Sequence, residues 1–222
     1  MISASIKMAL VRLQWRRKLY GPPKPHLLRG AIADQFPEEP MFHQHQDGAV
    51  LYRYPLIQYR WCNGEGVIAG FGEGAEILVR VPFNDMPLAL GNDQVSIENV
   101  LISCREELIS ITPKLVRYRF VSPWLPFNQK TYEPYLTMDE QGKANERDRM
   151  AVANLLLMLK GLGIRVEERL YATVEAGKSV GCRYKNQNLL GFYGNLLCNI
   201  DLPDGVAIGR AVSHGYGWIE RC

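Results

Sequence analysis

The segment DEQGKANERDRMAVANLLLMLKGLG, residues 139–163, carries the clearest structural signal in the chain and decides its fold class. Acidic residues stand in its first turn, apolar residues recur at helical spacing, and Gly161 and Gly163 allow the helix to end. The pattern therefore predicts a helix over residues 139–161. Its predicted apolar face consists of Val152, Leu155, Leu156, Leu159 and Leu162.

Strand patterns lie on both sides of this helix. LVRYRFV, residues 115–121, is typical of a strand and is stopped by SPWLP, residues 122–126. After the helix, strands are predicted over residues 166–174, 198–202 and 217–221. The C-terminal half therefore runs strand, helix, strands.

The N-terminal half repeats this order. Residues 3–15 alternate as a strand does, and residues 26–36 have helical spacing that stops before Pro37. AVLYRYPLIQYRW, residues 49–61, is typical of a long half-buried strand in which Pro55 indicates an edge or a bulge. The rest of this half consists of a glycine-punctuated stretch at residues 64–74, a segment at residues 75–81, and a predicted hairpin over residues 96–104 and 108–112.

These patterns predict an α+β fold of two tandem ferredoxin-like (RRM-like) domains with a C-terminal glycine-rich loop. We place the N-terminal domain at residues 1–112 and the C-terminal domain at residues 113–222. The second short helix of each domain is not located by the pattern. Such domains have an open sheet face, on which RRM-type modules bind RNA, although neither half carries the RRM aromatic signature.

Composition narrows the functional classes. The 222 residues carry a formal net charge of +3 and a pI of about 8.6, which permits a nucleic-acid partner without demanding one. The five cysteines are scattered and odd in number, which argues against a disulfide framework and a zinc ribbon. No apolar run approaches the roughly 18 residues of a membrane span, and the N-terminus does not look like a signal peptide. We expect a cytoplasmic protein without membrane contact.

The first candidate site is the loop FHQHQ, residues 42–46. RNA is cut without a metal when one group deprotonates the 2′-hydroxyl and another protonates the departing 5′-oxygen, and histidine suits both roles. In an extended chain, His43 and His45 would project to the same side about 6.6 Å apart. Two alternatives stay open, namely surface histidines without a role and an H-x-H metal site, although only His26 and His214 could complete the latter as histidine ligands.

The second candidate is the glycine-rich segment GVAIGRAVSHGYG, residues 205–217. Glycines allow backbone N–H groups to approach a phosphate closely, and Arg210 adds a fork of donors. A glycine-rich hairpin that serves only its own turn is the alternative.

Two further patterns are less specific. Cations and aromatic rings are interleaved, as on a surface that binds nucleic acid, but a solvated sheet face gives the same pattern. The string ATVEAGKS, residues 172–179, has lost the first glycine of a Walker A motif, and we predict a turn there rather than a phosphate-binding loop. The cations and rings in question are Arg12, Arg16, Arg17, Lys18, Tyr52, Arg53, Tyr54, Tyr59, Arg60, Arg117, Tyr118 and Arg119.

Taken in order, four segments resemble the endoribonucleases of the CRISPR-associated RAMP superfamily that cut precursor CRISPR RNA at each repeat. The double-histidine loop is similar to that of the type I-B-like subgroup, and the C-terminal segment resembles the glycine-rich motif of the superfamily. The segments are HLLRGAIA at 26–33, FHQH at 42–45, YRFVSPWLPFNQ at 118–129 and LLGFYGNLLCNIDLPDGVAIGRAVSHGYG at 189–217.

The resemblance implies a metal-independent cut, with no cofactor, that leaves a 5′-hydroxyl and a 2′,3′-cyclic phosphate. It implies that His43 and His45 are the acid–base pair and that Tyr52 helps to position one of them. It also implies that the glycine-rich loop grips the RNA backbone. The residues that would do so are Gly209, Arg210, Ser213, Gly215 and Gly217.

The chain departs from the family pattern in two places. The catalytic lysine of some members has no clear counterpart, since Lys24 is only the nearest candidate, and Arg29 or Arg53 would supply positive charge in its stead. A helix tyrosine of other members falls near Ala33 or Asp34, which favours a histidine pair. The implied partners are CRISPR repeat RNA and other CRISPR-associated proteins, and pairing of two chains is left open. A non-catalytic RAMP subunit that holds guide RNA is the alternative function.

Overall fold

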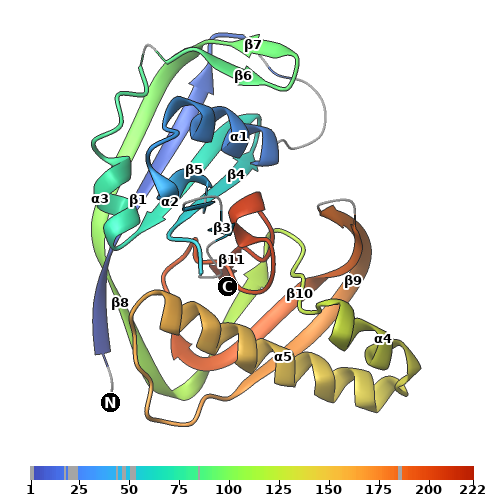
Figure 1. Cartoon of the computed structure of the whole chain (residues 1–222). Helices are drawn as coiled ribbons and strands as arrows, with labels where there is room; N and C mark the ends of the chain where they lie inside the picture. The colour runs from blue at the N-terminus through green and yellow to red at the C-terminus, as the bar shows by residue number, and fades with distance from the viewer. Residues whose placement is uncertain are drawn as a thin grey trace. The chain divides into compact units, whose positions relative to one another are not determined.

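The computed structural model describes residues 3–17, 19, 25–43, 45–46, 49–50, 54–84, 86–184 and 187–222, without the side chains of residues 45–46 and 49–50. The chain divides into two compact units. The N-terminal unit comprises Ile6–Glu107 and Ser213–Gly215. The C-terminal unit comprises Met1–Ser5, Leu108–Val212 and Tyr216–Cys222. Figure 1 shows the elements of each.

The N-terminal unit has the β-α-β-β-α-β order of a ferredoxin-like domain. Its sheet has the strand order β4-β5-β1-β8, in which β5 pairs antiparallel with both β1 and β4. Its main elements are β1 (Ser3–Trp15), α1 (Pro25–Gln35), β4 (Ile57–Cys62), β5 (Glu65–Phe71), α3 (Glu73–Leu78) and the first part of β8 (Ile97–Phe120). Short additions are α2 (Pro40–His43), β2 (His45–Gln46), β3 (Ala49–Val50), β6 (Leu88–Leu90) and β7 (Asp93–Val95).

The C-terminal unit repeats the topology with one replacement. Its strand order is β9-β10-β8-β11, and its elements are the rest of β8, α4 (Gln129–Thr137), α5 (Glu140–Gly161), β9 (Ala172–Tyr184), β10 (Gln187–Asp201), η1 (Val212–His214) and β11 (Ile219–Arg221). A ferredoxin-like domain has its second helix between the third and fourth strands, here β10 and β11. Among residues 202–218, which are all described, the only helical residues are the three of η1. The glycine-rich segment therefore stands where the second helix would be, and the predicted fold class is confirmed.

Helix α5 confirms the central sequence prediction but shifts its face. The Asp139 carboxylate accepts a hydrogen bond from the Gly142 N–H at 2.7 Å and caps the helix. Leu155 and Leu159 are buried as predicted, but Leu156 is 46% exposed, so its assignment to the core was wrong. The buried face is instead Met150, Ala151, Asn154, Leu155, Met158 and Leu159. The apolar pattern did not reveal this face because one of its members, Asn154, is polar. Asn154 is buried because its side chain accepts a hydrogen bond from the Trp124 Nε1–H at 2.9 Å.

Two predicted strand boundaries in the N-terminal half were wrong. The predicted hairpin over residues 96–112 is one continuous strand, β8. Charged residues at 105–107 indicated a turn, whereas they are polar positions of a strand that has no Gly or Pro between Ile97 and Thr112. The predicted long strand over residues 49–61 consists of the separate strands β3 and β4. Residues 51–53 lie outside the described residues, and Tyr54 to Leu56 are not in a strand.

The glycine-punctuated stretch contains a strand that the pattern missed. Strand β5 pairs with β4 through a two-residue turn at Asn63 (φ 51°) and Gly64 (φ 86°), with Cys62 opposite Glu65. Asn-Gly is a strong signal for such a turn. The glycines inside β5 serve packing, since a β-carbon on Gly66 would lie 2.9 Å from the Trp15 ring.

The C-terminal strands are longer than predicted or displaced. Strand β9 begins at Ala172 rather than at residue 166, and of the strand predicted at residues 198–202 only 198–201 are in β10, which begins at Gln187. The string at residues 172–179, where we predicted a turn, lies inside β9, so that prediction was wrong. Because an extended strand cannot fold around a phosphate, this string is not a P-loop. Strand β11 lies within the predicted range 217–221.

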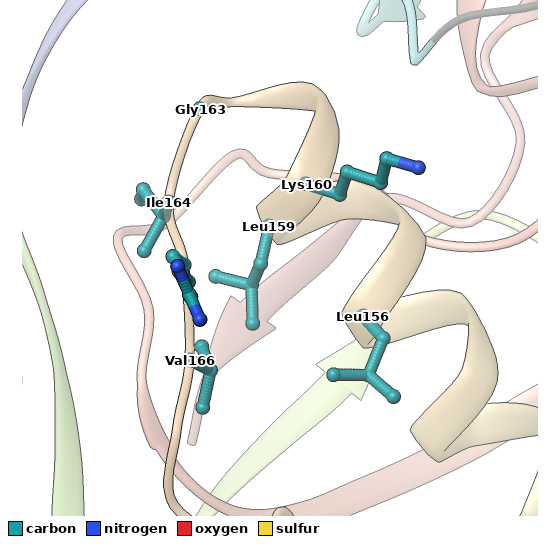
Figure 2. Close-up of a pocket in the computed structure, with 7 residues that line it drawn as sticks. Leu156, Leu159, Lys160, Gly163, Ile164 and Val166 are labelled. Atoms are coloured by element: carbon teal, nitrogen blue, oxygen red, sulfur yellow. The ribbon is translucent and has the colours of Figure 1, made fainter.

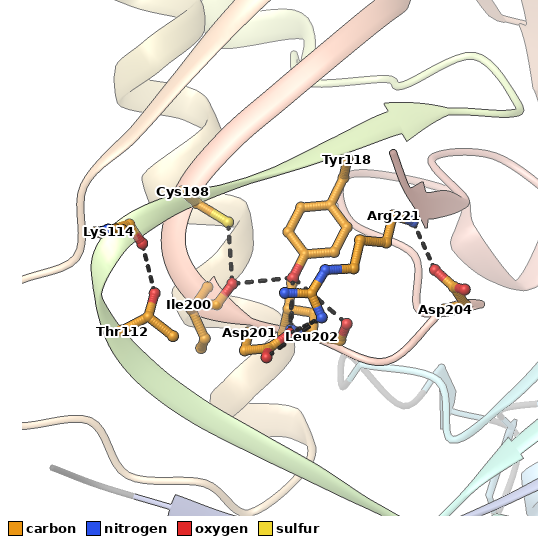
Figure 3. A network of polar contacts seen from close by, with 9 residues as sticks. All are labelled: Thr112, Lys114, Tyr118, Cys198, Ile200, Asp201, Leu202, Asp204 and Arg221. Atoms are coloured by element: carbon orange, nitrogen blue, oxygen red, sulfur yellow. Dashed lines mark hydrogen bonds and ion pairs between the residues drawn. The ribbon is translucent and has the colours of Figure 1, made fainter.

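A buried tyrosine fastens the strands of the C-terminal unit to one another (Figure 3). The Tyr118 hydroxyl accepts a hydrogen bond from the Leu202 N–H at 2.7 Å and donates to the Ile200 carbonyl at 3.2 Å. The Arg221 N–H donates to the Asp204 carboxylate at 2.6 Å. Burial raises the pKa of Tyr118 and raises the pKa of the neighbouring Cys198 thiol to about 12.

The raised pKa values predict that the protein loses stability at alkaline pH. The unfolded chain releases the Cys198 proton from about pH 9, whereas the folded chain keeps it to about pH 12, so the free energy of unfolding falls as pH rises through this range. Each such group contributes about 1.4 kcal/mol per pH unit. Urea denaturation of Cys198→Ala between pH 7.5 and 10.5 should show a shallower decline than the wild type. Cys222→Ala, an exposed control, should keep the wild-type slope. Equal slopes for all three proteins would contradict the assignment.

Candidate functional site

His43 is the last residue of the short helix α2 and is held by contacts from two neighbouring elements. Its half-exposed ring donates from Nε2 to the Pro37 carbonyl at 3.0 Å. The Arg29 guanidinium of α1 donates to the His43 carbonyl at 2.6 Å. The Tyr59 hydroxyl of β4 donates to the Phe42 carbonyl at 3.3 Å. Helix α2 is therefore bound to both α1 and β4, which places the His43 backbone firmly.

The local geometry corrects one step of the sequence argument. We expected His43 and His45 to share one side of an extended chain, but His43 is helical and only His45 lies in a strand. His45 pairs with Val50 in the β2–β3 hairpin, and its side chain lies outside the described part of the structure. Their relative placement therefore stays a prediction. Tyr52, Arg53 and Lys24 also lie outside the described residues.

Arg29, which we expected to supply positive charge toward the RNA, donates a hydrogen bond to the protein backbone in this structure. Its hydrogen bond to His43 puts a cation at the C-terminal end of α2, where exposed carbonyls favour positive charge. The Nε atom of Arg29 is buried and makes no hydrogen bond within the described residues. Arg29 therefore has a positioning function for His43, which the sequence pattern could not show.

The glycine-rich segment is fastened along residues 123–127 of the C-terminal unit. The Arg210 N–H donates to the Leu125 carbonyl at 2.9 Å, and Arg210 Nη1 donates to the Phe127 carbonyl at 3.1 Å. Gly209 has φ +98°, and a β-carbon there would lie 2.8 Å from the Trp124 ring. The Gly217 N–H donates to the Pro123 carbonyl at 2.9 Å. These glycines and Arg210 thus have packing functions, whatever else they bind.

The tip of the same segment belongs to the N-terminal unit. Gly215 has φ +88°, and a β-carbon there would lie 2.8 Å from Pro25 Cγ and 3.2 Å from the Tyr59 carbonyl oxygen. Ser213 is buried, with its hydroxyl 3.1 Å from His214 Nδ1. Tyr59 therefore touches both parts of the candidate site, since its carbonyl faces Gly215 and its hydroxyl bonds the residue before His43. Sequence reasoning placed Tyr59 on a surface and missed this function.

A strained residue lies in the glycine-rich segment near the end of the part assigned to the C-terminal unit, which runs to Val212. Ala211 has φ +56°, in the left-handed region that residues with a β-carbon seldom adopt. It lies between Arg210, whose N–H donates to the Leu125 carbonyl of the C-terminal unit, and Ser213, the first residue of the segment assigned to the N-terminal unit. Such strain persists only where the surrounding contacts enforce it.

The predicted basic and aromatic surface is only partly a surface. Tyr59, Arg60 and Tyr118 are at most 1% exposed, so their assignment to a solvent-facing or RNA-facing side was wrong. Arg117 and Arg119 of β8 are exposed and form ion pairs with Glu175 and Glu220. An alternating pattern identifies a strand but does not show which of its two faces is covered by the rest of the protein. This is why three of these side chains are buried.

Two hollows lie in the C-terminal unit, and neither is lined by a predicted site residue. The larger, about 400 Å³, lies at the end of α5, where Leu156, Leu159 and Val166 line it beside Lys160 (Figure 2). The smaller, about 200 Å³, lies between α4 and the start of β10. Within the described residues, no three His, Cys, Asp or Glu side chains come together as metal ligands. No helix of the described chain is long and apolar enough to cross a membrane.

The two ferredoxin-like units and the glycine-rich segment in place of a helix define the tandem architecture of RAMP proteins. Comparison with protein families finds the Cas6b N-terminal domain at residues 4–107 and the Cas6b C-terminal domain at residues 110–222. The chain therefore belongs to the Cas6b family.

Two solved Cas6b structures resemble the chain over nearly its full length. A crystal structure of a Cas6b superimposes with a TM-score of 0.89 at 30% identity, covering 99% of this chain and all of the other. A second, described as a CRISPR RNA processing endoribonuclease Cas6b, gives a TM-score of 0.73 at 27% identity, covering 97% of this chain and all of the other. An uncharacterised protein of Methanocaldococcus jannaschii is 33% identical over 138 residues, which are 62% of this chain and 94% of that protein.

The Arg29 contact predicts a local effect on α2. Arg29→Met removes the charged hydrogen bond to His43, which is worth about 1.5–3 kcal/mol, so amide exchange at residues 41–43 should accelerate about tenfold or more. Hydrogen–deuterium exchange measured by mass spectrometry tests this. Arg12→Met, which removes the part-buried ion pair between Arg12 of β1 and Glu65 of β5, serves as the control and should leave α2 unchanged. Unaltered exchange of α2 in Arg29→Met would show that Arg29 does not hold it.

Proposed function

We propose that this chain cuts CRISPR repeat RNA without a metal, using His43 and His45 as a general acid–base pair. The observation that carries the proposal is the way in which neighbouring elements hold His43 in position. A half-exposed imidazole stands at the end of a helix that α1 and β4 both fix, and Tyr59 of β4 also contacts the glycine-rich segment. A Cas6b relative described as a CRISPR RNA processing endoribonuclease supports the choice of substrate.

The reaction needs two proton transfers. One imidazole takes the proton of the 2′-hydroxyl, whose oxygen forms a bond to phosphorus, and the other gives a proton to the 5′-oxygen as its bond to phosphorus breaks. The products are a 2′,3′-cyclic phosphate and a 5′-hydroxyl. In the neutral ring, donation from Nε2 to Pro37 leaves Nδ1 as the nitrogen without a proton, and in the imidazolium both nitrogens donate. The Pro37 contact is compatible with both charge states of His43.

The remaining candidates serve binding and charge. Tyr52 orients one imidazole, and Arg53 or Arg29 offsets the negative charge that grows on the phosphate. Gly209, Arg210, Ser213, Gly215 and Gly217 form the segment that we propose to follow the RNA backbone. The packing contacts of the glycines support this, because they keep the segment's backbone fixed before RNA arrives.

Substitution of the histidines tests the acid–base pair. His43→Ala and His45→Ala should each slow cleavage of repeat RNA by about 10²-fold or more while RNA affinity survives. His26→Ala, which removes an exposed histidine of α1, should cut at the wild-type rate. Single-turnover rates on a panel of CRISPR repeat RNAs, with filter binding in parallel, provide the measurement. Reactions run in parallel with excess EDTA and with Mg²⁺, and a wild-type enzyme that cuts only with Mg²⁺ would refute the metal-free mechanism.

A modified substrate tests the internal nucleophile. Repeat RNA with a single 2′-deoxy nucleotide on the 5′ side of the cut lacks the attacking hydroxyl, so it should bind normally and resist cleavage. Gel analysis of the intact and deoxy RNAs, with mapping of the product ends, is the readout. Binding of every repeat RNA without cleavage of any would instead favour the non-catalytic RAMP subunit.

A further inference from the structure

The smaller hollow of the C-terminal unit has the features of a binding site and no assigned function. Its volume is about 200 Å³. One wall is the N-terminal turn of α4 with the residues before it, and the other is the start of β10. The side chains that matter are Phe127, Asn128, Gln129 and Tyr132 on the first wall and Gln187 and Asn188 on the second.

The walls present polar groups that the fold itself does not use. Gln129, Tyr132, Gln187 and Asn188 make no side-chain hydrogen bond to any described residue. Each amide carries two N–H donors and an acceptor oxygen, and the tyrosine adds a hydroxyl on a flat ring. Phe127, which is only 3% exposed, forms the apolar floor of the hollow together with Leu189 and Leu190. Donors, acceptors and aromatic surface therefore converge on one small space.

The hollow is already formed without a ligand. The segment before α4 is joined to β10 by two hydrogen bonds between the backbones of Trp124 and Phe192, both 2.9 Å. The Asn128 side chain caps α4 by accepting the Thr131 N–H at 3.0 Å. The Phe127 ring packs on Tyr135 with centroids 4.3 Å apart. Because both walls are fixed, a ligand would bind with little ordering cost.

Size and chemistry together select the ligand. Sites for whole small molecules are usually about 300–1,000 Å³, so this one fits a single flat ring system. RNA-binding proteins hold unpaired bases by stacking them on aromatic side chains and hydrogen-bonding their edges. Arg210 of the glycine-rich segment donates to the Phe127 carbonyl, which puts a cation beside the floor of the hollow, where a phosphate would follow the base. We propose that this pocket receives one unpaired base of the bound RNA. The inference rests on the proposed function, in that RNA is the ligand.

A thermodynamic cycle tests the pocket directly. The probe is a repeat RNA that the wild type cuts, in which each unpaired position is replaced in turn by an abasic nucleotide. Stacking of one base is worth about tenfold in affinity or more, so one abasic position should weaken binding by about that factor. Tyr132→Ala should weaken binding of the intact RNA equally and should cause no further loss with that abasic RNA. Tyr132→Phe keeps the ring and should bind within about threefold of the wild type.

The control and the outcomes separate this inference from the proposed function. Tyr171→Ala removes an exposed tyrosine of the same unit outside the pocket and should not alter affinity. If the losses of affinity from Tyr132→Ala and from every abasic position simply add, the pocket holds no base. The same conclusion follows if Tyr132→Ala binds RNA like the wild type. In both cases cleavage of intact RNA by the wild type would still support the proposed function. If the wild type neither binds nor cuts any repeat RNA, the proposed function is wrong and the pocket proposal falls with it.

Discussion

The close approach of Gly215 to Tyr59 is the constraint on which the candidate site depends. No β-carbon fits between Gly215, Pro25 and the Tyr59 carbonyl without displacement, so the tip of the glycine-rich segment can lie there only as glycine. The same tyrosine is fully buried and holds the backbone beside His43 through its hydroxyl. Tyr59 thus contacts both the backbone next to His43, the residue proposed for proton transfer, and the glycine-rich segment, which is proposed to bind the RNA backbone. Burial raises the pKa of Tyr59, which keeps its hydroxyl a donor throughout the physiological range.

The exchange of a helix for a loop explains how an ordinary fold supports such a site. In the N-terminal unit, α3 occupies the second helix position and buries Ala75 and Leu78 in the core. In the C-terminal unit, the corresponding connection from β10 to β11 has room for backbone turns that a regular helix would not allow. Its positive φ angles, including +98° at Gly209, let N–H and carbonyl groups turn toward neighbouring segments. The connection from β10 to β11 therefore directs main-chain groups to neighbouring segments, as the Arg210 N–H to the Leu125 carbonyl, while the four-stranded sheet stays intact.

Elements could be predicted from the sequence where their buried residues are apolar and regularly spaced. The helix over residues 139–161, the first strand and the helix beginning near Pro25 were found because their apolar spacing is regular. Prediction failed at β8, because charged residues on a strand look like a turn, and at β5, because its glycines pack against Trp15 rather than break the strand. The Asn63-Gly64 turn would have revealed β5. For the candidate site, residue types pointed to His43, but the functions of Arg29 and Tyr59 depend on contacts across 14 and 17 residues that no local pattern contains.

The assignment of Ser213, His214 and Gly215 to the N-terminal unit has a consequence for how the gene can be divided. A polypeptide that ends at Glu107 omits the three residues that occupy the space beside Pro25 and Tyr59. The two halves of the coding sequence are therefore not two autonomous modules. Grafting the first half onto another protein would leave that space vacant, and only supply of the missing tripeptide from a separate fragment or a redesigned linker would restore the contacts with Pro25 and Tyr59.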